Sequence, residues 1–194
     1  KRNAEKKPCN FPKDSAQDYN LLFNINELKD AITKTNNSAP GPDEIHYQFI
    51  RHLPPEVLTI LLSLFNYIWS SDFFPSSWKE AIIIAIPKPG KDHSNPSNYR
   101  PIALTSCLCK TMERMVYTRL LWKLEAVRAL DISQCGFRKN HSTTDHLVGY
   151  ETFIRNALIN GDHVVSVLFD LEKAYDTTWK YGILQDLASL DFIG

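Results

Sequence analysis

Residues 164–170 lead an apolar run into an acid. The run VVSVLF, residues 164–169, is followed directly by Asp170, with Glu172 and Asp176 close behind. Its β-branched and aromatic side chains predict a buried strand that ends on a carboxylate. Such an aspartate is often a turn residue or a helix N-cap. It can also bind Mg²⁺, which takes one or two carboxylates and leaves other positions for water and substrate phosphate.

A second candidate site is the segment PKPGKDHSNPSNYRP, residues 87–101, which follows a predicted strand at 82–86. It presents Lys88, Lys91 and Arg100 among prolines and a glycine that limit its freedom. Phosphate recognition favours a bidentate guanidinium beside a mobile ammonium group, so Arg100 and Lys88 could hold a polyphosphate. The alternative is a solvated hairpin loop.

The third segment is QCGFRKNHS, residues 134–142. An aromatic ring at Phe137 and cations at Arg138 and Lys139 are what a nucleic-acid strand uses for stacking and phosphate contacts. A zinc site from Cys135 and the two nearby histidines is not favoured, because their spacing matches no common pattern and a fourth ligand is missing.

A helix-rich framework must position these segments. Apolar spacing and capping residues predict helices at 24–38, 45–52, 56–71, 105–127, 143–159 and 183–190, with a turn around Gly41. The first helix has Leu28, Ala31 and Ile32 on one face, and the helix at 56–71 is apolar enough to be buried on all sides. The two predicted strands do not make a stable sheet alone, so further strands are expected in the loops or after Gly194.

Composition and charge set the class of protein. The chain has 194 residues, 43% of them hydrophobic, and no net charge, which is enough for a globular core. Residues 1–76, 77–140 and 141–194 carry net charges of −1, +6 and −5. A basic middle beside an acidic end suits a site that holds phosphates and divalent cations, although solvated faces give the same pattern.

The sequence predicts an intracellular protein without a membrane segment. No apolar run approaches the roughly 18 residues that cross a bilayer, and residues 1–19 have no apolar centre that could serve as a secretory signal. The four cysteines include no CxxC pair and are expected to be reduced thiols in the core or at the surface.

The order of the segments resembles one enzyme family. AIIIAIPKPGKDHSNPSNYRPIALTSCLCKTMERM, QCGFRKNHSTTDHL and FDLEKAYDTTW occur in the order found in reverse transcriptases of non-LTR retrotransposons, the LINE and Jockey-like elements. NSAPGPDEI upstream resembles the segment SxGxDxI that precedes the fingers of these enzymes. The resemblance covers residues 20–194. It implies an RNA-directed DNA polymerase that uses Mg²⁺, an RNA template, a DNA primer and dNTPs.

The resemblance assigns roles residue by residue around the acid. Asp170 matches the first catalytic aspartate of polymerase motif A, and the carbonyl of Leu171 matches a further metal ligand. Tyr175 matches the aromatic residue, usually Phe, that lies under the nucleotide sugar and excludes a 2′-hydroxyl. Asp176 is expected to orient the turn.

It also assigns residues that would bind the nucleotide and the template. Arg100 and Lys88 match residues that hold the incoming triphosphate, together with the backbone amides of Lys173 and Ala174. The template and incoming base would lie along three further positions, which are Gln134, Phe137 and Arg138.

The implied fold is α+β, part of a right-hand polymerase: a linker at 1–20, fingers at 21–160 and the start of the palm at 161–194. No two aspartates are adjacent in the chain, so the YxDD motif is absent, as are the thumb and any endonuclease residues. We therefore expect these residues to be inactive alone. The alternatives are a non-catalytic nucleic-acid-binding or interaction protein derived from a decayed or domesticated element, and a purely structural helical domain. The parent enzyme would act in a nuclear or cytoplasmic ribonucleoprotein.

Overall fold

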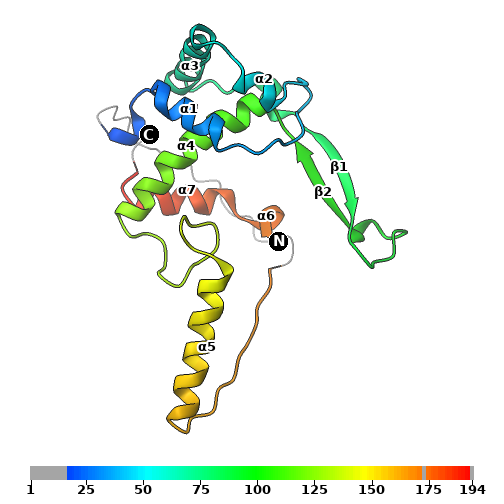
Figure 1. The fold of residues 1–194 in the computed structure, drawn as a ribbon, viewed down its shortest axis with the longest axis vertical. Helices are drawn as coiled ribbons and strands as arrows, with labels where there is room; N and C mark the ends of the chain where they lie inside the picture. The colour runs from blue at the N-terminus through cyan, green and yellow to red at the C-terminus, as the bar shows by residue number, and fades with distance from the viewer. Residues whose placement is uncertain (1–16, 172–173, 193–194) are drawn as a thin grey trace. The chain divides into compact units, whose positions relative to one another are not determined.

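The computed structural model describes residues 17–171 and 174–192, which fall into two compact units (Figure 1). Over these residues the N-terminal unit covers 17–122 and the C-terminal unit covers the rest. The elements, in chain order, are α1 (Ile25–Thr33), α2 (Tyr47–Arg51), α3 (Pro55–Ser70), β1 (Ile82–Pro87), β2 (Tyr99–Leu104), α4 (Cys107–Ala126), α5 (Thr143–Ile159), α6 (Ala174–Thr177) and α7 (Lys180–Ser189). Short 3-10 turns lie at Asp18–Asn20, Ser76–Lys79 and Pro96–Asn98. The described residues are thus mixed α+β, with one small antiparallel sheet. The predicted linker at 1–20 lies mostly outside the described residues.

Helix α1 begins with a capping box. The Asn24 side chain accepts the Glu27 N–H at 3.1 Å, and the Glu27 carboxylate accepts the Asn24 N–H at 2.8 Å, so two backbone donors of the first turn are satisfied. The predicted apolar face is confirmed, because Leu28, Ala31 and Ile32 are all buried.

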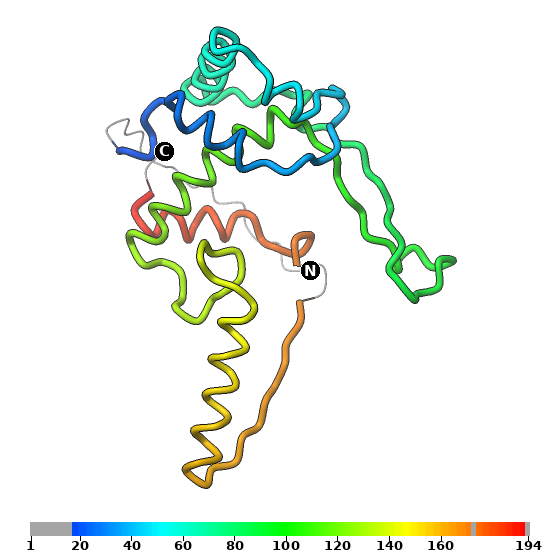
Figure 2. The backbone as a smooth tube through the Cα atoms, viewed as in Figure 1, coloured from blue at the N-terminus to red at the C-terminus, as the bar shows by residue number. Residues whose placement is uncertain are grey.

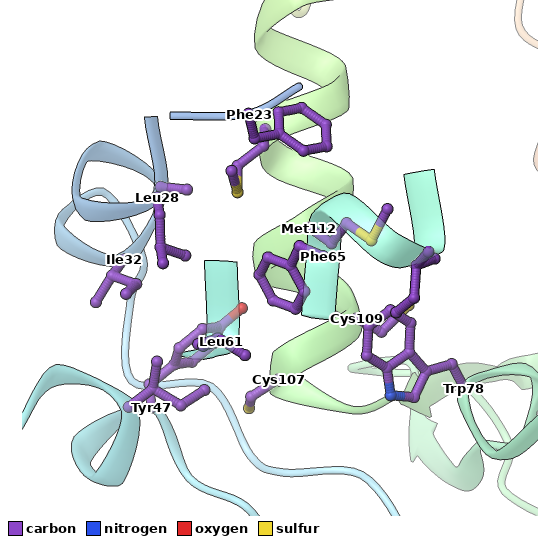
Figure 3. Packing of buried hydrophobic residues seen from close by; sticks show 14 residues of the cluster. Phe23, Leu28, Ile32, Tyr47, Leu61, Phe65, Trp78, Cys107, Cys109 and Met112 are labelled. Atoms are coloured by element: carbon purple, nitrogen blue, oxygen red, sulfur yellow. The ribbon is translucent and has the colours of Figure 1, made fainter. Parts of the chain in front are cut away.

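The core of the N-terminal unit lies where α1, α2, α3 and α4 meet (Figure 3). Phe65 of α3 has no exposed surface, and its ring lies edge-on to Trp78 with centroids 6.1 Å apart. Helix α4 contributes its N-terminal half. The core residues that α4 provides are Cys107, Cys109, Met112 and Met115.

Helix α3 differs from the prediction of a helix buried on all sides. Leu61, Phe65 and Ile68 are buried, but Ile60 and Tyr67 on the remaining surface are exposed. The prediction was wrong because dense apolar composition does not supply neighbours. Within the described residues of the N-terminal unit, α3 packs against the core along one side only.

Arg119 of α4 fixes the start of the N-terminal unit. Its Nε and Nη2 donate to the two carboxylate oxygens of Glu27 at 2.6 and 2.8 Å. Its Nη1 and Nη2 also donate to the carbonyls of Tyr19, Leu21 and Leu22. The guanidinium stacks over the ring of Phe23 at 4.3 Å. Since every N–H of the group has an acceptor, this largely buried charge is compensated.

The strands β1 and β2 pair as an antiparallel hairpin, with Ile86 opposite Arg100 and Ile84 opposite Ile102. The strand predicted at 82–86 is confirmed. The prediction of a loop up to Pro101 was wrong, because Tyr99–Leu104 is the partner strand. Proline lacks an N–H and usually argues against a strand, but a two-stranded ribbon has edges that tolerate it.

The C-terminal unit contains α5, an extended segment at 162–171, and α6 and α7 (Figure 2). The predicted helix at 143–159 is confirmed at both ends, with Ser142 and Asp145 forming a capping box.

The prediction of a buried strand at 164–169 was wrong within the part of the chain that the structure describes. These residues are extended but unpaired and exposed, and the Tyr150 and Ser166 hydroxyls form a hydrogen bond from this segment to α5. A strand is buried only when partner strands cover it.

No helix within the described residues is long and apolar enough to cross a bilayer.

Gly41→Ala tests the close packing of the turn at residues 39–44. A Cβ at Gly41 would lie 2.5 Å from the Ser106 nitrogen and 2.6 Å from the Thr105 carbonyl carbon, both backbone atoms that cannot rotate away. We expect a loss of about 2 kcal/mol or more in the free energy of unfolding, measured by urea titration. Gly149→Ala, in α5 with open space around it, should instead gain roughly 0.5–1 kcal/mol. Equal effects of the two variants would contradict the packing.

Glu27→Gln tests the Arg119 contact and its pH dependence. Burial raises the pKa of Glu27, but hydrogen bonds from Arg119 and Asn24 outweigh it and hold the pKa below its usual value of 4.5. A carboxylate with a lowered pKa stabilises the fold above its unfolded pKa, and this is lost as pH falls through the folded value. We expect Glu27→Gln to cost about 2 kcal/mol at pH 7. The difference from wild type should shrink as the pH falls through the folded pKa of Glu27, which lies below 4.5.

The measurement is urea unfolding followed by tryptophan fluorescence at several pH values, since the ring of Trp69 lies 5.2 Å from that of Phe23. Asp30→Asn is the matched control, because the Asp30–Lys34 pair is exposed and should contribute little. A Glu27 effect independent of pH would contradict the role given to its carboxylate.

Candidate functional site

Asp170 lies near the end of the extended segment of the C-terminal unit. Phe169 before it is 92% exposed and Leu171 after it is also exposed. Asp170 and Leu171 are thus adjacent in the chain, and the described residues do not enclose them. Glu172 and Lys173 lie outside the described residues, so the predicted contact of the Lys173 amide with phosphate is not described.

Tyr175 lies on the one-turn helix α6, four residues after the Leu171 carbonyl. Its side chain is 82% exposed. The helix is held at its start by the Ala174 carbonyl, which accepts hydrogen bonds from the Thr178 N–H at 3.1 Å and the Thr178 hydroxyl at 2.6 Å. The ring is thus placed on a fixed turn close in sequence to Asp170.

Lys88 lies where β1 runs into the hairpin loop. Its N–H donates to the Asn98 carbonyl at 2.8 Å, and its ammonium donates to the Ser97 carbonyl at 3.0 Å. The loop is further closed by Asn98 Nδ2, which donates to the Asp92 carbonyl at 2.7 Å, and by Gly90 at φ +69°. The ammonium keeps donors for a phosphate, since it has three.

Arg100 lies on β2 opposite Ile86. Because facing residues of an antiparallel pair project from the same side, its guanidinium shares a face with Ile86 and Ile84. The side chain is exposed, and no acceptor for it is found among the described residues. The hairpin therefore carries Lys88 where its loop begins, directly after β1. It carries Arg100 on β2, which follows the loop.

The loop at residues 127–142, here called the Phe137 loop, carries Gln134, Phe137 and Arg138. Arg138 Nε and Nη2 donate to the Glu125 carboxylate at 3.0 and 2.8 Å, and Nη1 donates to the carbonyls of Asp131 and Gln134 at 2.9 and 3.4 Å. The hydrogen bonds from Arg138 lower the pKa of Glu125, and the carboxylate raises the pKa of Arg138. Arg138 is thus turned inward, while the Phe137 ring is 86% exposed.

The predicted site residues fall in both units. Asp170, Leu171, Ala174, Tyr175 and the three residues of the Phe137 loop belong to the C-terminal unit. Lys88 and Arg100 belong to the N-terminal unit. Within the C-terminal unit, the Phe137 loop precedes α5, Asp170 lies on the extended segment after α5, and Tyr175 lies on α6.

Glu125 and Asp131 were missed by sequence reasoning. Asp131 accepts the Ser133 N–H at 2.8 Å and so forms a turn in the Phe137 loop. A signal for this turn was present, because Asp followed two residues later by Ser is a common turn pattern. Nothing in the sequence pairs Glu125 with Arg138 across thirteen positions.

The cysteines and the other acids form no second reactive centre in the described residues. Cys107 and Cys109 are buried, and burial raises the pKa of both thiols, that of Cys109 to about 12 with Glu113 contributing. They are therefore protonated packing residues. Within the described part of the chain, no three His, Cys, Asp or Glu side chains cluster as metal ligands.

The chain matches a known family model and several curated proteins. Residues 86–193 match the model described as "Reverse transcriptase (RNA-dependent DNA polymerase)". The chain is 35% identical over 82% of its length to the "RNA-directed DNA polymerase from mobile element jockey" of Drosophila melanogaster, covering 18% of that protein. It is 32% identical over 86% of its length to the "Probable RNA-directed DNA polymerase from transposon BS" of the same species, covering 18% of it. The Pol polyprotein of the type-1 element R2 of Popillia japonica is 30% identical over 84% of the chain, which covers 22% of that protein.

Limited proteolysis tests the exposed course of the segment before Asp170. An extended backbone without hydrogen bonds fits a protease active site, whereas a helix in a core must unfold first. We expect chymotrypsin to cleave the chain after Phe169 well before it cleaves after Phe65, which is fully buried in α3. Mass spectrometry of the early fragments measures the order. Protection of Phe169 equal to that of Phe65 would mean that the segment is paired.

Proposed function

Because this chain belongs to the reverse transcriptase (RNA-dependent DNA polymerase) family, we propose that it is a part of the RNA-directed DNA polymerase of a non-LTR retrotransposon. The observation that carries this proposal is the family match over residues 86–193, which spans the hairpin loop with β2, the Phe137 loop and the segment that ends at Asp170. The chain spans about 18% of the jockey and BS proteins that it matches. The activity, substrates and partners of the whole enzyme are therefore part of the proposal.

Asp170 is the proposed catalytic carboxylate and metal ligand, with the Leu171 carbonyl as a second oxygen. The described residues supply one carboxylate and one carbonyl at this point, and no cluster of three ligating side chains. Mg²⁺ needs near-octahedral oxygen coordination, and two-metal transfer needs at least one more carboxylate. These residues therefore fit only part of such a site. We assign Mg²⁺ to the complete enzyme and derive no step through it here.

The remaining residues have roles in binding substrate. Arg100 and Lys88 are proposed to hold the triphosphate of the incoming dNTP, which the exposed guanidinium and the spare ammonium donors support. The amides of Ala174 and Lys173 are proposed to meet the same phosphates. The exposed ring of Tyr175 is proposed to lie under the deoxyribose and to exclude a 2′-hydroxyl by contact.

The proposed fold is part of a right-hand polymerase, with fingers at 21–160 and the start of the palm at 161–194. The extended residues 164–169 support this division, because they have the sequence of a buried strand and, in the described chain, no covering strand. The proposed partners are an RNA template and a DNA primer, in a nuclear or cytoplasmic ribonucleoprotein. Gln134 and Phe137 are proposed to contact the template.

The 194 residues alone are proposed to be inactive, because one carboxylate cannot hold both the attacking and the leaving oxygen through metal ions. We expect no primer extension by this chain on an RNA template. In the intact protein that contains it, Asp170→Asn should lower DNA synthesis at least about a thousandfold, since several kcal/mol of transition-state stabilisation are lost.

Asp176→Asn is the matched control for Asp170→Asn. It makes the same chemical change six residues later on α6, and because Asp176 is expected to orient the turn it should cost far less activity. Incorporation of labelled dNTP measures both variants. Equal losses, or an active Asp170→Asn enzyme, would remove Asp170 from the catalytic role. No incorporation by the intact wild-type protein, with nucleic-acid affinity unchanged by Asp170→Asn, would favour a non-catalytic nucleic-acid-binding protein.

A further inference from the structure

The backbone of the Phe137 loop holds an unusual conformation. Phe137 has φ +61° and Asn140 has φ +63°, in the left-handed region. Asn adopts this region readily, but a bulky side chain such as Phe does so only when its surroundings impose it. The residue that carries this strain has its ring 86% exposed. An exposed aromatic ring is thus carried on a backbone in a strained conformation.

Arg138, the next residue, supplies the restraint. Four of its hydrogen bonds run to residues that precede Phe137: two to the Glu125 carboxylate at the end of α4 and two to the carbonyls of Asp131 and Gln134. They tie the residue after Phe137 to the chain before it. Its side chain is only 12% exposed. The bidentate geometry fixes both distance and orientation, which a single ammonium could not do.

These contacts leave Arg138 poorly suited to bind a phosphate. A guanidinium has five N–H groups, and most of those of Arg138 already have acceptors within the C-terminal unit. Its charge is also balanced by Glu125 at 2.8 Å. Lys139 and Arg128 are exposed on the same loop and are the cations available to a nucleic-acid backbone.

We propose that Glu125 and Arg138 are positioning residues, whose ion pair holds the Phe137 loop in one conformation and so presents the Phe137 ring as a stacking surface for an unpaired base of single-stranded RNA. This inference rests on the proposed function as a reverse transcriptase. In this inference Arg138 does not contact the template itself but holds Phe137, which does. It also adds Glu125, an acid that a nucleic-acid interface would otherwise exclude.

The proposal fits single-stranded RNA and not a duplex. A single exposed ring flanked by a lysine can stack on one splayed base and let the ammonium meet the neighbouring phosphate. Bases within a duplex are already stacked on each other. The Phe137 loop is therefore expected to prefer an unstructured oligonucleotide.

The test compares Glu125→Gln with Glu151→Gln in the 194-residue chain. Both variants remove one negative charge from the C-terminal unit, but Glu151 forms only an exposed pair with Arg155 within α5. The probe is an unstructured RNA oligonucleotide titrated by fluorescence anisotropy in a series of salt concentrations. Hydrogen exchange at the Gln134 amide, which donates to the Asp131 carbonyl at 3.1 Å, follows the order of the Phe137 loop.

The two roles of Arg138 predict opposite signs. A positioning role predicts that Glu125→Gln loosens the Phe137 loop and weakens RNA binding about three- to tenfold, part of what one stacked base contributes. Glu151→Gln leaves binding unchanged or slightly tighter. If Arg138 contacts phosphate directly, Glu125→Gln frees its charge and binding becomes tighter. That result, or an unchanged affinity, overturns the proposal.

Two further measurements separate positioning from general destabilisation. In a Phe137→Leu background, Glu125→Gln should have no further effect on RNA affinity, because the ring it supports is gone. The salt dependence should be the same in wild type and Arg138→Gln, whereas loss of a phosphate contact lowers the slope by about 0.7 for a single strand. Additive effects or a lower slope count against the proposal. A wild-type chain without salt-dependent RNA affinity would overturn both the inference and the template role on which it rests, whereas normal binding insensitive to Glu125 would overturn the inference alone.

Discussion

The N-terminal unit depends on one guanidinium. Arg119 reaches from α4 to the start of α1 and to the carbonyls before it, and it stacks on Phe23. A partly buried charge is costly when any of its donors lacks an acceptor, and here all of them are satisfied. Phe23 in turn lies against Trp69 of α3. The course of residues 19–23, the cap of α1 and one edge of the core therefore rest on the same side chain.

The two units differ in how their apolar residues are used. The N-terminal unit has a core of fourteen buried residues, drawn from helices α1 to α4, from Phe23 before α1 and from the turn before β1. In the C-terminal unit, Phe192 is the one buried residue among those described, although α5 carries Leu147, Val148 and Phe153 and residues 164–169 are mostly apolar. Hydrophobic burial needs two surfaces, and this unit provides one. The polar contacts of the C-terminal unit, such as the Tyr150–Ser166 hydrogen bond, consequently set the course of its chain.

Local patterns predicted most of the elements and few of the contacts. The face of α1, the limits of α5 and the strand at 82–86 follow from residue spacing and caps, which act over a few positions. Helix α4 was expected to begin at Thr105, but it begins at Cys107, because the Ser106 hydroxyl accepts the N–H groups of Leu108 and Cys109 at 3.2 and 3.4 Å. Strand β2 was hidden by its proline. The Glu125–Arg138 and Glu27–Arg119 pairs join residues far apart in the sequence, and no short-range pattern announces them.

The exposed segment before Asp170 has a consequence for the physical behaviour of the chain. Six uncharged residues with high β-propensity, VVSVLF, are the composition that forms intermolecular cross-β structure when unpaired. Acids flanking such runs act as gatekeepers against aggregation. Asp162 and Asp170 are in these positions. Neutralising Asp170 lengthens the uncharged run to residues 164–171, so the proposed metal ligand also opposes aggregation of the segment that precedes it.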